Sequence, residues 1–211
     1  MIVAIDGPAG SGKGTISKKL AEYFNLSYLD TGILYRAVAL QMLTEGINEK
    51  DCRSAKKVAR QVSITSIDHS GIRTRAVSDL ASKIATISSV RQELLTRQRR
   101  FAQNPDPDKD GAILDGRDIG TIVCPNADFK LFIIAELEIR AKRRWKELLQ
   151  SDPTAIYCEV LEEMRSRDER DTNREDAPLV VTSDAMVIDT SNKSIDVSFN
   201  EAKNWILSRR F

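Results

Sequence analysis

Histidine and cysteine are scarce in this sequence, which has one histidine and three cysteines among its 211 residues. A single histidine excludes metal sites built from several histidines and argues against a Ser-His-Asp triad. His69 lies in an Asp-His-Ser-Gly segment typical of a turn, so we expect it to be structural. The cysteines are far apart and form no CxxC pair, which leaves zinc ribbons and thioredoxin-like chemistry without support. This usage favours a reduced, cytoplasmic chain.

The sequence also lacks long apolar runs and an excess of charge of either sign. Clean apolar runs such as Ile2–Ile5 and Leu131–Ala135 are far shorter than the ~20 residues that a membrane span needs. Lys and Arg total 32 against 31 Asp and Glu, and a net charge of +1 argues against an electrostatically driven nucleic-acid binder. We therefore expect no membrane association and no nucleic-acid partner. We also expect the chain to be a monomer.

Hydrophobic residues make up 41% of the chain, which suffices to bury the core of one domain. Short apolar strands alternate with amphipathic helices, which is the pattern of a parallel α/β sheet. The expected strands are Ile2–Ile5, Tyr28–Leu29, Ala112–Asp115, Lys130–Ala135 and Met186–Asp189. The expected helices are Lys13–Phe24, Ile33–Leu43, Glu136–Leu149 and Ile195–Arg209. We predict an α/β fold in which a five-stranded parallel sheet is covered by helices on both faces.

Two stretches interrupt this alternation and are interpreted as insertions on the rim of the sheet. Residues 45–105 carry helical patterns and one alternating segment, Val62–Ile67, but no strand of the core type. Residues 150–175 combine helical periodicity with dense charge. The predicted core therefore consists of residues 1–44, 106–149 and 176–211.

A glycine-rich loop follows the first expected strand and opens the first expected helix. Its residues are Gly7, Pro8, Ala9, Gly10, Ser11, Gly12, Lys13, Gly14 and Thr15. They form the G-x-x-x-x-G-K pattern of a phosphate-binding loop (P-loop), whose backbone N–H groups and helix N-terminus attract phosphate oxygens. Lys13 would reach the β- and γ-phosphates of a nucleotide, and the Thr15 hydroxyl would face Mg²⁺ directly or through water. The G-K-G-T ending matches the variant found in nucleoside monophosphate kinases.

A P-loop serves kinases, switches and ATPase motors alike, so the phosphate acceptor must be found elsewhere. Arg36, Arg117 and Asp118 follow expected strands, and in open α/β sheets ligands bind at the carboxyl ends of the strands. These residues should surround one crevice beside the P-loop. An arginine near a strand end is often only a surface ion pair, but several beside a phosphate loop favour a second anionic ligand.

The segment from Arg165 to Arg174 contains many arginines and no lysine. On a helix, Arg167, Arg170, Asp171 and Arg174 share one face, whose excess positive charge an anion would neutralise. A solvated face stabilised by ion pairs remains the alternative, although arginine forks favour phosphate recognition. The same alternative applies to the arginines of the expected helix at 136–149. Phosphoryl transfer needs such positioning and charge stabilisation, and insertions that close over the site would exclude water.

Five segments of the sequence resemble the bacterial cytidylate (CMP) kinase family of P-loop nucleoside monophosphate kinases. They are Ile5–Thr15, Leu29–Arg36, Val90–Arg99, Asp115–Thr121 and Arg167–Arg174. The resemblance extends in order from Ile2 to the C-terminus. It implies a core with a CMP-binding insertion at 45–105 and a lid at 150–175. It also implies transfer of the ATP γ-phosphate to CMP or dCMP with Mg²⁺, giving ADP and CDP or dCDP.

The resemblance also implies roles for individual residues. The cytosine-reading set would be Ser82, Arg91 and Asp118, and the acceptor phosphate would meet Thr31, Arg36 and Arg117. Lid contacts to sugar and phosphate would come from Arg167, Asp171 and Arg174, whereas Arg140 and Arg144 resemble the adenine-side and catalytic arginines of related kinases. The implied catalytic residues are Lys13, Arg117, Arg144, Arg167 and Arg174, and ATP would bind to the P-loop residues and Arg140.

Other readings of the same residues remain open. The chain could be a P-loop kinase of another small acceptor, such as UMP or AMP. A nucleotide-dependent switch without an acceptor is a different class, and it would not need the second group of arginines. The CMP-binding insertion also departs from the family pattern, because its antiparallel stretch is reduced to Val62–Ile67, a turn and Ile72–Thr74.

Overall fold

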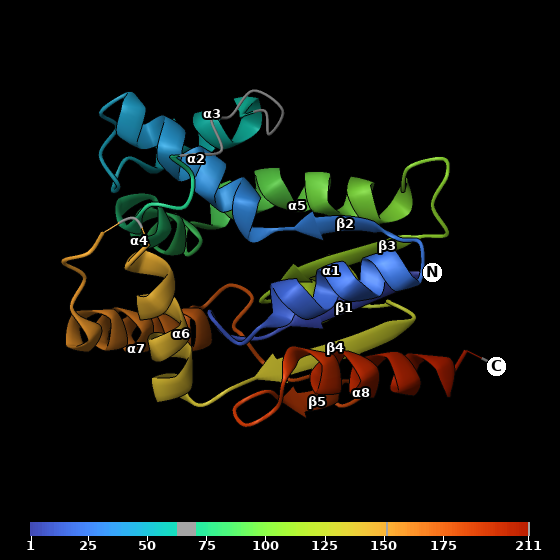
Figure 1. Ribbon diagram of the computed structural model, residues 1–211. Coiled ribbons are helices and arrows are strands. Elements are labelled where there is room, and N and C mark those ends of the chain that lie inside the picture. Colours follow the sequence, from blue (N-terminus) through green and yellow to red (C-terminus); the bar gives the residue numbers. More distant parts are fainter. Residues whose placement is uncertain (63–70, 151, 211) are drawn as a thin grey trace.

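The computed structural model describes residues 1–62, 71–150 and 152–210, and a five-stranded parallel sheet lies at its centre (Figure 1). The strands are β1 (Ile2–Asp6), β2 (Ser27–Asp30), β3 (Ala112–Gly116), β4 (Phe129–Ile134) and β5 (Met186–Asp189). Their order across the sheet is β2-β3-β1-β4-β5, and every neighbouring pair is parallel. The predicted fold class is confirmed, and each predicted strand overlaps an observed one.

Helices cover both faces of the sheet because its strands carry apolar residues on both sides. On one face, Val3 and Ile5 of β1 pack against α1 (Lys13–Tyr23) and α8 (Ile195–Leu207). On the other face, Ala4 packs in a cluster formed with α5 (Ser88–Gln103) and a π-helical turn, η2 (Ile119–Val123). No pattern in the sequence predicts this helical turn between β3 and β4.

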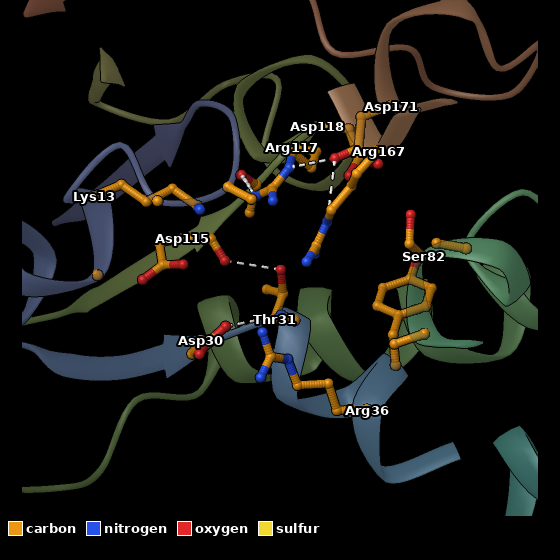
Figure 2. Close-up of a pocket in the computed structure, with 18 of the residues that line it drawn as sticks. Lys13, Asp30, Thr31, Arg36, Ser82, Asp115, Arg117, Asp118, Arg167 and Asp171 are labelled. Carbon is orange, nitrogen blue, oxygen red and sulfur yellow. Dashed lines mark hydrogen bonds and ion pairs between the residues drawn. The ribbon is translucent and has the colours of Figure 1, made fainter. Parts of the chain in front are cut away.

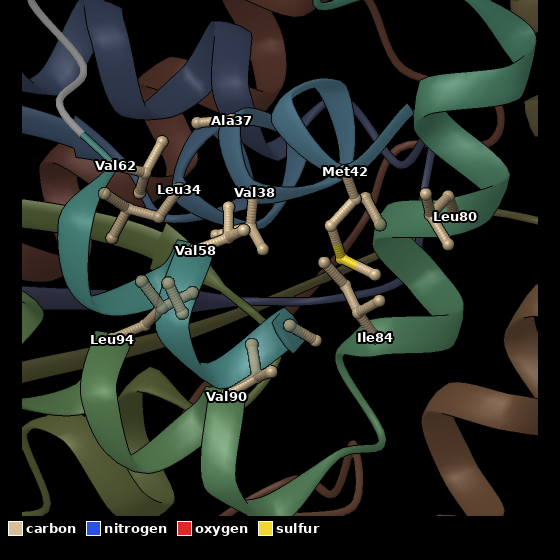
Figure 3. Packing of buried hydrophobic residues seen from close by; sticks show 14 of the residues in the cluster. Leu34, Ala37, Val38, Met42, Val58, Val62, Leu80, Ile84, Val90 and Leu94 are labelled. Carbon is tan, nitrogen blue, oxygen red and sulfur yellow. The ribbon is translucent and has the colours of Figure 1, made fainter. Parts of the chain in front are cut away.

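The chain between β2 and β3 builds a second apolar core from four helices, α2 (Gly32–Thr44), α3 (Cys52–Gln61), α4 (Arg75–Ile84) and α5. Figure 3 shows the side chains of Met42, Val58, Ile84 and Leu94 meeting between these helices. The region predicted as an insertion therefore shares its core with α2. Helix α5 contributes to the sheet cover as well, because Ala102 near its end packs with β3.

The alternating part of the expected antiparallel stretch in this region lies mostly in 63–70, outside the described residues. Its expected return, Ile72–Thr74, is a turn that leads into α4. Ile72 is buried, and Thr74 caps the helix by accepting a hydrogen bond from the Val77 N–H (3.4 Å). The capping side chain explains why the chain turns into a helix at this point.

Two further helices, α6 (Leu137–Leu148) and α7 (Tyr157–Asn173), pack against each other through a small apolar cluster. Its centre is formed by Ala141, Leu148, Val160 and Met164. Together with α4, these helices lie at the end of the sheet toward which the strands point (Figure 1). No helix among the described residues is long and apolar enough to cross a membrane.

Candidate active site

The glycine-rich loop connects β1 to α1 in a conformation that only glycine tolerates. Gly10 and Gly12 have positive φ angles of 72° and 86°, and a Cβ atom on Gly7 would lie 2.0 Å from the Ile133 carbonyl oxygen. The first N–H groups of α1 consequently face the loop, as in a phosphate-binding site. Lys13 begins the helix and donates a hydrogen bond to the Pro8 carbonyl (3.4 Å).

Carbonyl groups of this loop are held by residues from other elements. Arg140 of α6 donates to the Ala9 carbonyl (3.2 Å), and Thr190, which follows β5, donates to the Ser11 carbonyl (2.8 Å). These contacts pair carbonyl oxygens of the loop with protein donors. The loop is therefore supported from the side of α6 and β5.

A cavity of about 180 Å³, the first cavity, lies at the carboxyl ends of β2 and β3, beside the P-loop (Figure 2). Every residue predicted to contact the acceptor lines it: Thr31, Arg36, Ser82, Arg91, Arg117, Asp118, Arg167, Asp171 and Arg174. These side chains come from α2, α4, α5, α7 and the segment after β3. The structure thus brings together residues that are up to 143 positions apart in the chain, counted from Thr31 to Arg174.

Two buried carboxylates organise the arginines of the first cavity. Asp118 pairs with Arg91 (2.5 Å) and lies 3.6 Å from the Arg174 guanidinium. Asp171 pairs with Arg117 (2.8 Å), and several surrounding arginines keep the pKa of the Asp171 carboxyl low against the effect of burial. The Asp171 carboxyl is therefore ionised and able to accept hydrogen bonds at neutral pH.

The cavity nevertheless has an excess of positive charge. Burial and the neighbouring Arg117 cation lower the pKa of Arg167 to about 10. Burial likewise lowers the pKa of Arg36, which forms no ion pair with any described residue. In Figure 2 the Arg167 and Arg36 guanidinium groups and the Lys13 amine point toward the centre of the cavity. An anionic ligand at this point would restore charge balance.

The Lys13 amine is close to both cations and carboxylates of the site. Burial and the Arg117 cation lower the pKa of its amine to about 7, although Asp115 and Asp30 act in the opposite direction. Asp115 is buried at the end of β3, accepts a hydrogen bond from the Tyr28 hydroxyl (2.6 Å), and has a pKa raised by burial. Phosphate oxygens beside Lys13 would favour its charged form.

A second cavity, of about 710 Å³, opens on the other side of the P-loop, toward the start of α8. Thr15, Arg143, Thr190 and Ile195 contribute to its lining. Gly10, Lys13, Gly14 and Asp30 line both cavities. The phosphate-binding loop therefore lies between two spaces, each large enough to receive part of a ligand.

The structure does not bring Arg140 to the second cavity, where it was predicted to contact adenine. Its buried guanidinium pairs with Asp168 of α7 (2.7 Å) and also donates to the Ala135 carbonyl (2.7 Å). Arg143, one helical turn further along α6, lines the cavity instead and donates to the Thr190 hydroxyl (3.1 Å) and carbonyl (2.7 Å). Arg140 does not reach this cavity because Asp168 of α7 and the Ala9 and Ala135 carbonyl groups enclose its guanidinium.

Arg144 and Arg170 lie outside the first cavity. Arg144 pairs with Glu147 (3.1 Å) and lines a third cavity between α4, α6 and α7. Arg170 does not line the first cavity with Arg167 and Arg174, since it turns toward α4 and pairs with Asp79 (3.2 Å). It lines the third cavity, which Arg167 also lines. The helical face predicted from the sequence is therefore divided between two surfaces.

Sequence reasoning missed several residues around the P-loop. Asp30, Asp115, Arg143 and Thr190 were not assigned to the site, although each lies at or just after the end of a strand or beside a predicted arginine. The strand-end rule that selected Arg36 and Arg117 could have selected both aspartates and the threonine. Arg143 could only be distinguished from Arg140 by tertiary packing.

A glycine-rich phosphate loop between two cavities, at the carboxyl ends of a parallel sheet, defines a P-loop kinase. The fold resembles shikimate kinase from Bacteroides thetaiotaomicron, with a TM-score of 0.52 and 9% identity over 98% of each chain. An uncharacterised protein from Eubacterium ventriosum is similar as well, with a TM-score of 0.54 and 15% identity over 99% of each chain. At these identities the likeness establishes the fold alone.

The sequence comparisons then identify the family. The cytidylate kinase family model matches residues 3–206. Cytidylate kinase from Paramagnetospirillum magneticum is 49% identical over 209 residues, which cover 99% of both chains. Cytidylate kinase from Azorhizobium caulinodans is 48% identical over 202 residues, or 96% of both chains. The chain belongs to the cytidylate kinase family.

Proposed function

We propose that the chain transfers the γ-phosphate of ATP to CMP or dCMP, producing ADP and CDP or dCDP. The observation that carries the proposal is the pair of cavities that share Lys13 and Gly14 of the P-loop. A donor nucleotide in one cavity and an acceptor in the other would direct their phosphates at the same lysine. A switch protein has no use for the first cavity, which arginines line.

The acceptor base would be read at Asp118. An ionised carboxylate only accepts hydrogen bonds, so it suits the N4 amino group of cytosine, whereas the Arg91 guanidinium suits N3 or O2. Uracil would place an O4 acceptor against the carboxylate. The buried Ser82 hydroxyl lacks a hydrogen-bond partner among the described residues and is free to contact the base. This donor and acceptor set favours CMP over UMP and AMP.

The acceptor phosphate would be held by Thr31, Arg36 and Arg117, and the sugar and phosphate by Arg167, Asp171 and Arg174 from α7. The Nε atom of Arg167 is buried without a hydrogen-bond partner in the described chain. The attacking phosphate oxygen of CMP is already ionised at neutral pH, so the transfer needs no general base. Positioned cations instead stabilise the charge on the transferring phosphoryl group. The cations that would do so line the first cavity: Lys13, Arg117, Arg167 and Arg174. Arg144 would act from the third cavity, which it lines.

The residues beside the P-loop fit Mg²⁺. The Thr15 hydroxyl and the Asp30 and Asp115 carboxylates are the oxygen donors that this ion prefers, and a Cβ on Gly14 would lie 3.6 Å from Asp115 Oδ2. The described residues contain no cluster of three or more His, Cys, Asp or Glu side chains that could hold a metal ion. We propose that Thr15 holds Mg²⁺ directly or through water, with the aspartates nearby. When bound with ATP, Mg²⁺ would neutralise charge on the β- and γ-phosphates.

ATP would place its phosphates on residues 7–15 and its nucleoside in the second cavity. We assign the adenosine side of that cavity to Arg143 rather than Arg140. We also propose that the chain works as a monomer in the cytoplasm. Its three cysteines are unpaired, which suits a reducing compartment, and one chain supplies both cavities.

The two insertions would close over the substrates, 45–105 as the CMP-binding insertion and 150–175 as the lid, with residues 1–44, 106–149 and 176–211 as the core. Ion pairs join the insertions, since Arg75 of α4 contacts Glu159 of α7 (2.9 Å) and Asp79 contacts Arg170. Such closure would exclude water from the phosphoryl group.

The test is a panel of acceptors, CMP, dCMP, UMP and AMP, assayed at one MgATP concentration with the full chain. We expect CMP and dCMP to be phosphorylated with the highest kcat/KM. A preference for UMP or AMP would identify a kinase of another acceptor. ATP hydrolysis that no acceptor accelerates would identify a switch. The Lys13→Ala variant serves as the control for contaminating kinase activity.

A further inference from the structure

We propose that Asp6 is a positioning residue for recognition of the acceptor base, and that it acts through Asp118. The inference rests on the proposed role of Asp118 as the cytosine reader. Asp6 ends β1, and its side chain is only 5% exposed. Its carboxylate accepts hydrogen bonds from the Ile119 N–H (Oδ1, 2.8 Å) and the Gly120 N–H (Oδ2, 2.8 Å). Asp6 thus binds the two residues that follow Asp118.

These two N–H groups open the η2 turn and need an acceptor from outside it. The first N–H groups of any helix have no partner within the helix, and a buried N–H without an acceptor is costly. The side chain of Asp118 precedes the turn but does not cap it. A carboxylate has two oxygens and can accept from both groups, so Asp6 performs the capping from a strand 113 residues away.

The same turn determines where the Asp118 side chain lies. The Asp118 carbonyl accepts from the Ile122 N–H (2.9 Å) and the Val123 N–H (3.1 Å), which holds its backbone to η2. The carboxylate of Asp118 reaches into the first cavity, where Arg91 and Arg174 contact it. A shift at the start of η2 would therefore move the group that reads the base. π-Helical turns are rare and occur often at functional sites.

Asp6 has no counter-ion among the described residues, so its charge is held by the two N–H groups. Burial raises the pKa of the carboxyl to about 6 despite these hydrogen bonds, with Asp118 acting in the same direction and Arg117 against it. Lys130 of β4 passes nearby, because a Cβ on Gly120 would lie 3.2 Å from Lys130 Cδ and 3.4 Å from Asp6 Oδ2. The Lys130 amine nevertheless pairs with Asp184 (2.8 Å). The Asp6 carboxylate therefore accepts its hydrogen bonds from the start of η2.

The test compares the CMP/UMP ratio of kcat/KM in the full chain and in Asp6→Asn. An amide keeps the shape of the side chain but presents one donor group, so it can accept from only one of the two N–H groups. We expect the ratio to narrow at least about fivefold, while KM for ATP stays within about twofold. The control is Val3→Ala, a buried change on the same strand that faces α1 and α8, which should lower stability and leave the ratio unchanged.

A double variant separates positioning from a general loss of structure. If Asp6 acts through Asp118, Asp6→Asn combined with Asp118→Asn should have the same CMP/UMP ratio as Asp118→Asn alone. Independent, additive effects on the ratio would overturn the proposal, as would an Asp6→Asn variant that loses activity on both acceptors equally. If Asp6→Asn does not fold, Gly120→Ala disturbs the same hydrogen bonds from η2, and an unchanged ratio in that variant contradicts the proposal. An unsubstituted chain without any preference for CMP would refute the proposed function instead.

Discussion

The two cavities beside the P-loop differ in size and in how their charges are arranged. The first holds about 180 Å³, and two buried carboxylates, Asp118 and Asp171, pair with arginines that line it. The second holds about 710 Å³, and of its arginines Arg143 is anchored to Thr190. A small cavity with fixed donors and acceptors penalises a wrong ligand through unpaired buried groups, whereas a larger cavity does not. We infer that base discrimination resides on the acceptor side.

Lys13→Ala should remove a function that both cavities share and have the largest effect. The lysine amine would stabilise phosphate charge in the transition state, and loss of one such group costs about 10²–10³ in rate. We expect kcat to fall by that factor with CMP and UMP alike, in a chain that still folds. Steady-state assays and a thermal melt check both parts. More than about a tenth of the original rate would contradict this role.

Asp118→Asn should affect the first cavity alone. The amide can donate as well as accept, so the penalty against the uracil O4 disappears together with the bond to the cytosine N4. We expect the CMP/UMP ratio of kcat/KM to narrow at least about tenfold, since a charge-assisted bond is worth about 1.5–3 kcal/mol. If Asp118 only supports Arg91, both acceptors should suffer equally. Kinetics with each acceptor at saturating MgATP distinguish the two outcomes.

Arg140→Met and Arg143→Met test whether these neighbours have the different roles that the structure indicates. Removal of Arg140 leaves Asp168 without its partner, and we expect a loss of about 2 kcal/mol in the free energy of unfolding. Arg143→Met should instead raise KM for ATP about fivefold with little change in stability or in the CMP/UMP ratio. Denaturant melts and ATP titrations provide the readouts. If Arg140→Met raised KM for ATP and Arg143→Met lowered stability, Arg140 would be the arginine on the adenine side.

Proton uptake should reveal the charge state of Lys13. Its pKa of about 7 in the ligand-free chain lies below its usual 10.5, so this group makes the chain less stable as pH falls from 10.5 through 7. Bound phosphates would raise the pKa again. Nucleotide binding should then take up close to one proton at pH 8 and about a tenth of one at pH 6. Calorimetry in two buffers of different ionisation enthalpy measures it, and Lys13→Met should show no uptake.

Much of this architecture could be predicted from the sequence because it depends on local patterns. Apolar runs located the strands, and the P-loop spacing located the first turn. The strand-end rule and helical spacing, together with the family resemblance, selected residues that the fold gathers around the first cavity. Those patterns report on neighbours in the chain, and the ends of parallel strands are neighbours in space.

The remaining features depend on partners that are distant in the chain. The η2 turn has five residues, too few for a periodic pattern, and its cap is Asp6 of another strand. Arg140 and Arg143 are three residues apart on one helix, and only packing against Asp168 and Thr190 separates their roles. The Arg170 side chain turns away from the first cavity because it pairs with Asp79 of α4. Tertiary contacts of this kind leave no signal in a single sequence.

The contrast between the cavities is tested most directly by exchanging one base at a time in the unmodified chain. The measurement is kcat/KM for CMP against UMP at saturating MgATP, and for ATP against GTP at saturating CMP. We predict that the acceptor exchange costs at least about tenfold more than the donor exchange. Among the described residues, the buried Asp118 carboxylate lines the first cavity, where the base must donate, and no buried carboxylate lines the second. A donor exchange that costs as much as the acceptor exchange, or more, would contradict this prediction.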